Sequence, residues 1–298
     1  MESFTPNTPA LTAPTQAGKT APILLDFQSC LPARGMRRIR HPVFLMLMDP
    51  NVRNLLYRNP QFYELAYPEP NDETPMMCRR MFSRYLSQPP RSILDLGCGT
   101  ARDLHSLSRE CPDCWGVDFL PEAIGFARKQ RPRLHLQAGD ARHIRLGRAF
   151  DVIMSMGSAF MYAITDKDVA LTLETFVAHA HPGTLLILDI NNAASYLGGK
   201  HFKPTSVLRV NSPQFTATAR STYEFNRRRQ TLIRRRVWSI EGQGDVEDFC
   251  EYRLFFPAEL EHLLNERGFR VAGMFDNMQL QETDLCGPRL YVPAIFQP

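Results

Sequence analysis

Glycines and carboxylates recur along one stretch of the chain, and their types suit the binding of a nucleotide-like ligand. Gly97 and Gly99 directly follow the apolar segment Ser92–Leu96 and precede a helix-like segment that begins at Arg102. Glycine lets the backbone turn sharply and approach a ligand without a Cβ in the way. A strand, a glycine turn and a helix N-terminus in this order predict a ligand site at the edge of a doubly wound sheet.

The charge beside this turn narrows the ligand class. Asp95 stands just before the first glycine, where a carboxylate suits an ammonium-bearing ligand better than a pyrophosphate. A dinucleotide fingerprint requires a small residue three places after Gly99, and this chain has Arg102 there. The pattern therefore argues against NAD or FAD.

Two further acidic residues end the short strands expected next along the chain. Asp118 is placed to bond a ribose diol, and Phe119 beside it could lie against an adenine face. Asp140, between Gly139 and Ala141, could accept a hydrogen bond from an adenine amino group. Together with the glycine turn, these residues predict one adenosine-binding site.

These motifs resemble, in order and spacing, the class I S-adenosylmethionine-dependent methyltransferases. Within that superfamily the chain is similar to bacterial small-molecule enzymes of the deoxyaminosugar N,N-dimethyltransferase kind, over roughly residues 60–298. Tyr63–Tyr67 resembles the tyrosine-flanked arm that precedes their core. The chain departs from the family at Ala101 and at Thr184, where glycine is usual or frequent.

The resemblance implies S-adenosylmethionine as cofactor and methyl transfer by direct in-line displacement without a metal. The residues that it marks for the cofactor lie in the arm, around the glycine turn and near strand ends: Tyr67, Asp95, Gly97, Cys98, Gly99, Asp118, Phe119, Gly139, Asp140, Ala141, Met154, Ser155 and Met156. Tyr63 and Tyr162 are the catalytic candidates, and the alternative for both is ordinary packing.

No side chain near the expected pocket mouth is an obvious general base. His179 and His181 stand at the end of a helix before the fifth strand, where a helix C-terminal role is favoured. A hydroxyl acceptor usually needs a base, whereas a neutral amine does not. The sequence therefore favours an amine of a small molecule as methyl acceptor.

Composition excludes several other classes of protein. The 298 residues carry a net charge of only +4, which does not call for a nucleic acid or an anionic membrane. No run of eighteen apolar residues and no secretory signal pattern occurs. Seven scattered cysteines indicate reduced thiols and a cytoplasmic location. The single CxxC, Cys111–Cys114, lacks partners at ligand spacing, so we expect a chance loop and no metal site.

The chain divides into three predicted parts. Residues 1–35 have the composition of a flexible tail, and residues 36–88 predict an N-terminal helical arm or cap, with a membrane-surface helix as the alternative. Residues 89–298 predict a Rossmann-like α/β domain built on a seven-stranded methyltransferase sheet. Its final elements would be a helix over Pro257–Arg267 and strands near Val271–Phe275 and Leu290–Phe296.

An antiparallel β insert is expected at about residues 200–252, on the substrate side of the resembled fold. Alternating patterns predict its strands, at residues 206–210, 215–219, 231–240 and 248–252. Six arginines fall within residues 227–236. They could bind RNA or an anionic substrate, but a hairpin with solvated arginines is favoured because no aromatic residues interleave within the basic run.

Three functions stay open at this point. The leading hypothesis is methylation of a small molecule; the second is methylation of RNA or protein, which would need a basic groove joining residues 36–41 to the insert arginines. The third is a non-catalytic S-adenosylmethionine-binding scaffold, which the intact acidic and glycine positions disfavour. A membrane partner is not expected, a nucleic acid is disfavoured, and a homodimer is compatible with the sequence.

Overall fold

A computed structural model describes residues 54–68, 72–198, 202–211, 216–241 and 244–298. The predicted tail and the first part of the predicted arm lie outside these ranges. Contacts separate Met1–Leu47 from a unit spanning Met48–Pro298, so every described residue belongs to the second unit. Within the described ranges, no helix has the length and apolar character needed to cross a membrane.

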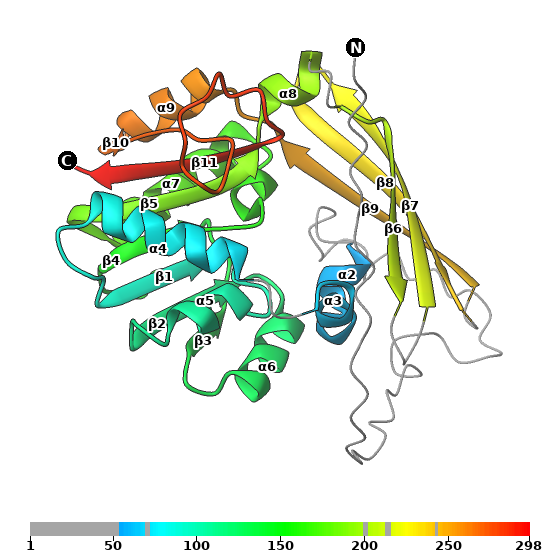
Figure 1. Cartoon of the computed structure of the whole chain (residues 1–298), viewed down its shortest axis with the longest axis horizontal. Coiled ribbons are helices and arrows are strands. Elements are labelled where there is room, and N and C mark those ends of the chain that lie inside the picture. The colour runs from blue at the N-terminus through cyan, green and yellow to red at the C-terminus, as the bar shows by residue number, and fades with distance from the viewer. Residues whose placement is uncertain (1–53, 69–71, 199–201, 212–215, 242–243) are drawn as a thin grey trace, which may run out of the picture. The chain divides into compact units, whose positions relative to one another are not determined.

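The predicted seven-stranded sheet is present, in the order β10-β11-β5-β4-β1-β2-β3 (Figure 1). Its strands have these bounds: β1 Ser92–Leu96, β2 Asp113–Asp118, β3 His135–Ala138, β4 Phe150–Ser155, β5 Ala180–Asn191, β10 Phe269–Val271 and β11 Arg289–Phe296. Strands β1 to β5 pair in parallel, while β11 runs antiparallel to both of its neighbours. The order reverses between β1 and β4, and ligands of such sheets bind beyond the carboxyl ends of the strands at that point.

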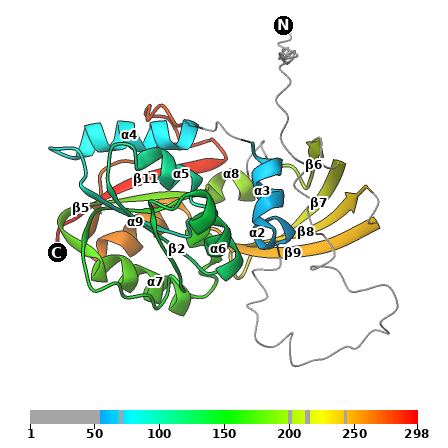
Figure 2. The same ribbon diagram turned by 90° about the horizontal axis from the view of Figure 1, so that it is seen from below.

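Helices cover both faces of this sheet. The helices have these bounds: α4 Glu73–Tyr85, α5 Arg102–Leu107, α6 Pro121–Gln130, α7 Asp166–Ala178, α8 Ala193–Gly198 and α9 Pro257–Asn265. Met81 of α4, Leu104 of α5 and Ile124 of α6 share one buried apolar cluster. Phe176 of α7 and Leu260 of α9 belong to another. Figure 2 shows α4 and α7 on opposite sides of the sheet.

The last elements differ slightly from the prediction. Helix α9 ends at Asn265, two residues before the predicted end at Arg267, and Gly268 follows with a positive φ of 78°. The penultimate strand lies at Phe269–Val271, so the predicted bounds, Val271–Phe275, were wrong. Beyond Val271 the backbone leaves the sheet, and Phe275 keeps only an isolated bridge to Tyr291.

The predicted insert is a separate four-stranded antiparallel sheet between β5 and β10 in the chain. Its strands have these bounds and this order: β6 Thr205–Asn211, β7 Thr216–Asn226, β8 Thr231–Ile240 and β9 Gly244–Arg253. Two short helices, α2 (Leu55–Arg58) and α3 (Pro60–Ala66), lie between this sheet and the seven-stranded one in both views (Figures 1 and 2). Phe62 of α3 packs edge-on against Trp238 of β8, with ring centroids 4.9 Å apart.

The prediction of solvated arginines holds near the hairpin turn and for Arg235 on the outer face of β8. Arg227, Arg228 and Arg229 are exposed, as expected. Arg234 and Arg236, however, are each only 7% exposed. Side chains alternate along a strand, so these two share the inner face of β8 with the fully buried Trp238.

Candidate functional site

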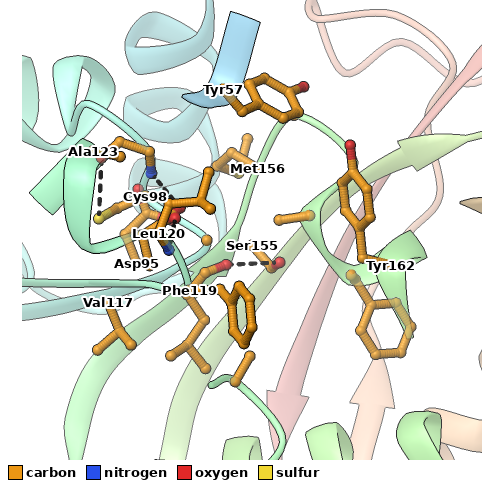
Figure 3. A pocket seen from close by; sticks show the side chains of 18 of the residues that line it. Tyr57, Asp95, Cys98, Val117, Phe119, Leu120, Ala123, Ser155, Met156 and Tyr162 are labelled. Carbon is orange, nitrogen blue, oxygen red and sulfur yellow. Dashed lines mark hydrogen bonds between the residues drawn. The ribbon is translucent and has the colours of Figure 1, made fainter. Parts of the chain in front are cut away.

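A cavity of about 230 Å³ opens beyond the carboxyl ends of β1, β2 and β4 (Figure 3). It is lined by all the predicted site residues except Tyr67 and Met154: Tyr63, Asp95, Gly97, Cys98, Gly99, Asp118, Phe119, Gly139, Asp140, Ala141, Ser155, Met156 and Tyr162. The fold thus brings residues from the arm, the glycine turn and four strand ends to one place. In this view Asp95 and Cys98 lie on the left, Tyr57 at the top and Tyr162 on the right.

The glycine turn after β1 forms part of the site. Its backbone conformation favours glycine at both positions, and at Gly97 there is also no space for a Cβ. Gly97 has a φ of +92°, and a Cβ added there would lie 2.3 Å from the Cβ of Ala159. Gly99 has a φ of +55°, and its backbone N–H donates to Oδ2 of Asp118 at 2.7 Å. This bond ties the turn to the end of β2, so the two predicted ligand segments are held together without a ligand.

Asp118 is held by the backbone on both sides of the cavity. Its Oδ1 accepts a hydrogen bond of 2.9 Å from the backbone N–H of Leu120, in addition to the bond from Gly99. Burial raises the pKa of Asp118, and these two backbone hydrogen bonds oppose the rise. Phe119 follows with 43% of its surface exposed, which leaves its ring available to an aromatic ligand.

Asp95 is the most electrostatically unusual group in the site. It is 3% exposed, and within the described part of the chain its Oδ1 has no hydrogen-bond partner. Burial raises the pKa of Asp95 well above its usual range, and the nearby charges of Asp103 and Asp118 raise it further. A buried carboxylate without a partner is costly unless a cationic group joins it, so the site is suited to an ammonium.

Asp140 lines the cavity but is not free. Arg142 binds it through Nε at 3.0 Å and Nη2 at 2.7 Å, and the backbone N–H of Arg142 donates to it at 2.9 Å. Arg142 also reaches Asp168 at 2.9 Å. Burial acts to raise the pKa of Asp140, but the hydrogen bonds from Arg142 hold it below the usual value. Arg142 is therefore a site residue that sequence reasoning missed, since an arginine two places after an acid carries no recognisable signal.

The other end of the cavity is aromatic. Tyr57, Tyr63 and Tyr162 line it. The Tyr63 ring lies 5.8 Å from the Tyr57 ring and 5.1 Å from that of Tyr67, and the Tyr57 ring lies 6.5 Å from that of Tyr162. Tyr57 was not predicted, because it belongs to the four-residue helix α2, too short to show any periodicity. Tyr67 is 37% exposed and stands outside the lining.

The arm that carries these tyrosines is tied to the glycine turn by charged residues. Arg131 binds Glu64 of the arm at 3.2 Å and donates to the carbonyl oxygen of Thr100 at 2.9 Å. Arg102 stacks over the Tyr63 ring at 5.1 Å and also lies 3.9 Å from Glu64. The arginine that argued against a dinucleotide therefore helps to hold the arm over the cavity.

Met154 of β4 is a predicted cofactor residue that does not line the cavity. Met154 is fully buried in the apolar cluster under α4 and α5, so it does not line the cavity. Ser155 points the other way, and its hydroxyl donates to the carbonyl oxygen of Leu96 at 3.0 Å. Strand β4 ends at Ser155, so Ser155 and Met156 stand where the cavity opens, whereas Met154 lies one residue further inside the strand.

The histidines and the CxxC pair lie away from the cavity. His179 is the C-cap of α7: its Nδ1–H donates to the Thr175 carbonyl at 2.7 Å, and its Nε2 accepts from the Leu146 N–H at 2.9 Å. Cys111 and Cys114 are buried, and the Cys114 thiol bonds to the Cys111 carbonyl oxygen. Among the residues described, no three His, Cys, Asp or Glu side chains are grouped as metal ligands.

Comparison with known proteins agrees with this geometry. The sequence profile of the family described as "Methyltransferase domain" matches residues 93–183. A dTDP-3-amino-3,4,6-trideoxy-alpha-D-glucopyranose N,N-dimethyltransferase from Streptomyces venezuelae is 33% identical over 98 residues, covering 33% of this chain and 41% of that enzyme. The aligned segment thus spans well under half of the relative's length.

Solved structures match over more of the chain. The amino pentose methyltransferase CalS10 from Micromonospora echinaspora, solved with S-adenosylmethionine bound, superposes with a TM-score of 0.64 at 20% identity, covering 79% of this chain and 95% of that one. DesVI from Streptomyces venezuelae superposes with a TM-score of 0.65 at 23% identity, covering 78% and 97%. The chain thus carries a methyltransferase domain at residues 93–183, in the fold of the class I S-adenosylmethionine-dependent methyltransferases.

Proposed function

We propose that this protein methylates a primary or secondary amine of a small molecule, with an amino sugar as the leading acceptor class, using S-adenosylmethionine. The observation that carries the proposal is the cavity as the described residues line it: one end has a buried carboxylate oxygen without a hydrogen-bond partner, and the other has an aromatic wall without a base. The names of the relatives, which act on amino sugars, support the acceptor class.

The residues of the first end fit this cofactor. The partnerless Oδ1 of Asp95 suits the ammonium of its methionine part, and the space at Gly97 admits no side chain. When bound, S-adenosylmethionine supplies a methyl group on a sulfonium, which is already electrophilic. We assign contacts with it to the lining residues of the predicted set: Asp95, Gly97, Cys98, Gly99, Asp118, Phe119, Gly139, Asp140, Ala141, Ser155 and Met156.

The tyrosines bind and orient the acceptor in this proposal. Burial raises the pKa of Tyr63 and of Tyr162 above that of an ordinary phenol, so both keep their protons at neutral pH. They then act as hydrogen-bond partners for an amine and not as bases. A neutral amine already has the lone pair that it needs, and the arm excludes water from the reaction.

Two further features bear on the alternatives. Methylation of RNA was tied to a continuous basic groove, but Arg234 and Arg236 are buried inside the insert instead of lining its surface. Residues 36–41, the other half of that groove, lie outside the described residues.

The cysteines of the described chain are all free, which supports our placement of the enzyme in the reducing cytoplasm.

Calorimetric titration of S-adenosylmethionine into the purified protein tests the first half of the proposal. We expect micromolar binding that Asp95→Asn weakens at least tenfold and that Asp245→Asn, at an exposed position of β9, leaves unchanged. Mass spectrometry of paired acceptors, an amino sugar and the same sugar with a hydroxyl in place of the amine, tests the second half. Methylation of the hydroxyl sugar but not the amino sugar would reverse the assignment of the acceptor.

A further inference from the structure

The turn that follows β4 has a backbone conformation that serine rarely adopts. Gly157 and Ser158 are consecutive, and both have positive φ, +60° and +69°. Glycine adopts this region freely, whereas for a residue with a Cβ it costs about 1–2 kcal/mol. Ser158 is 5% exposed and stands between two residues that line the cavity, Gly157 and Ala159. Such strain persists only where neighbouring groups hold the backbone in place.

Asp189 of β5 binds both residues of this turn. Its Oδ2 accepts a hydrogen bond of 2.9 Å from the backbone N–H of Gly157. Its carbonyl oxygen accepts one of 2.9 Å from the backbone N–H of Ser158. Strands β4 and β5 are parallel neighbours, so Asp189 stands next to the point where β4 ends and the turn begins. The side chain of Asp189 is only 9% exposed, so a buried carboxylate fixes the backbone of the turn.

Arg289 of β11 joins this carboxylate to the side chain of the turn. Strand β11 lies beside β5, and Arg289 stands opposite Asn191 in their register (Figure 1). Its Nε and Nη2 donate to Oδ1 of Asp189. Its Nη1 donates to the hydroxyl of Ser158 at 2.9 Å and to Oδ1 of Asn191 at 2.8 Å. Because the donors of a guanidinium are fixed in one plane, a single arginine can hold these three groups relative to one another.

The turn held in this way sets the width of the cavity beside the glycine turn. A Cβ added at Gly97 would lie only 2.3 Å from the Cβ of Ala159, so the two turns meet there. Asp95, which we assign to the ammonium of the cofactor, is two residues away along the chain. Asp189 and Arg289 do not line the cavity themselves. The residues that do so in the segment they hold are Gly157, Ala159, Phe160 and Tyr162.

We propose that Asp189 and Arg289 are positioning residues, which hold the turn of residues 157–159 at the distance from Gly97 that the methionine part of S-adenosylmethionine requires. Both residues act through the turn, since neither reaches the cavity. This inference rests on the proposed function, because it concerns the end of the cavity to which that proposal assigns the cofactor.

An ion pair suits this place better than neutral side chains. Oδ1 of Asp189 accepts from Arg289 while Oδ2 accepts from Gly157, so both oxygens are used. An asparagine has one acceptor oxygen and an NH₂ group, which would face one of these two donors. A lysine at position 289 keeps the charge but lacks the planar fork that joins Asp189 to Ser158. Asp189→Asn and Arg289→Lys should therefore release the turn with little change in side-chain volume.

Calorimetric titrations with S-adenosylhomocysteine and with adenosine separate this role from a general loss of structure. Adenosine lacks the amino-acid part, so the position of the turn should matter for the first ligand and not for the second. We expect Asp189→Asn and Arg289→Lys to weaken binding of S-adenosylhomocysteine at least tenfold and binding of adenosine less than twofold. Asp113→Asn is the matched control, because Asp113 also pairs with an arginine, Arg148, but stands at the start of β2, away from the cavity.

The outcomes distinguish this inference from the proposed function. Equal weakening of both ligands, or binding of S-adenosylhomocysteine that the variants leave unchanged, overturns the positioning role. A wild type that binds neither ligand counts against the proposed function instead. Asp189→Asn/Arg289→Gln removes both charges of the pair and covers the case in which a single variant, left with an unpaired charge, fails to fold. The same difference between the two ligands is expected for this double variant.

Discussion

If Asp95 binds the cofactor as proposed, we expect binding to depend on pH. Burial raises the pKa of this carboxyl, as do the neighbouring Asp103 and Asp118, whereas the ammonium of a bound S-adenosylmethionine favours its ionised form. Binding should therefore release a proton and tighten as the pH rises through the raised pKa. Calorimetry at one pH in two buffers of different ionisation enthalpy measures the protons released.

The same shift predicts the behaviour of the protein without ligand. A raised pKa means that the folded state holds the proton of Asp95 more tightly than the unfolded chain does. The contribution of this group to stability is therefore complete below its ordinary 3.8 and is lost as the pH rises through the raised value. Asp95→Asn should remove both this slope and the proton release, and a variant that still released the proton would assign the effect to another group.

Removing the methyl group of Ala101 should stabilise the folded protein. Its φ is +61°, in the left-handed region where a Cβ costs about 1–2 kcal/mol. Glycine relieves this strain but adds about 0.5–1 kcal/mol of freedom to the unfolded chain. We expect Ala101→Gly to stabilise the folded state by about 0.5 kcal/mol, measured by urea unfolding; a loss of 1 kcal/mol or more would contradict this account.

At the residue scale, the sequence revealed the groups whose chemistry is local. The glycines and acids at strand ends were found because turn geometry and ligand contact demand those residue types. Arg142 and Tyr57 were missed because their roles depend on partners brought together only by tertiary folding. Arg234 was singled out within the basic run, but its burial beside Asp248 of the neighbouring strand was not expected, because a run of arginines alone does not show which of them point inward.

Among the elements, the cap of α7 depends on a neutral histidine. Burial lowers the pKa of His179 below its ordinary 6.5, and its Nε2 must stay unprotonated to accept from Leu146. The folded state thus disfavours the proton, and stability should be full above pH 6.5 and fall as the pH drops below it. Denaturant unfolding between pH 5 and 8 measures this slope.

His179→Gln should flatten that dependence and cost about 1–2 kcal/mol at pH 8, because one or both hydrogen bonds weaken. His262→Gln is the matched control, since His262 is exposed on α9. A pH slope that persists in His179→Gln but disappears in the control variant would move the effect to α9.

Element positions followed from the sequence where periodicity was long enough to read. The ten residues of β8 include several β-branched residues and a tryptophan, which favour a strand, and the prediction of 231–240 matches it. The three residues of β10 cannot show a period, and the apolar residues after it predicted a strand where the chain has already left the sheet. The four residues of α2 were beyond prediction for the same reason.

For the molecule as a whole, the sequence predicted a second sheet inserted in the chain between strands of the first. It did not predict that the two sheets share a buried core. Leu188 and Ile190 of the central sheet belong to the same buried cluster as Leu232, Cys250 and Tyr252 of the insert. Hydrophobic pattern marks the buried face of each sheet, but it does not say which other face covers it. The aromatic end of the cavity, where Tyr57 was not predicted, lies next to this junction, since Tyr162 contacts Cys250 of the insert.

A shared core predicts that both sheets unfold together. The two tryptophans of the chain report on the two parts separately, since Trp115 lies on β2 and Trp238 on β8. Trp115→Phe leaves only Trp238, and Trp238→Phe leaves only Trp115. In each variant, unfolding followed by the fluorescence of the remaining tryptophan should have the same urea midpoint as unfolding followed by circular dichroism. Saturating S-adenosylmethionine should then raise the free energy of unfolding that each tryptophan reports by the same amount, about 2.7 kcal/mol at a hundred times its dissociation constant. If Trp238 instead unfolded at lower urea and ignored the cofactor, the insert would be an independent unit, and the buried cluster that joins it to the central sheet would contribute little to the stability of either.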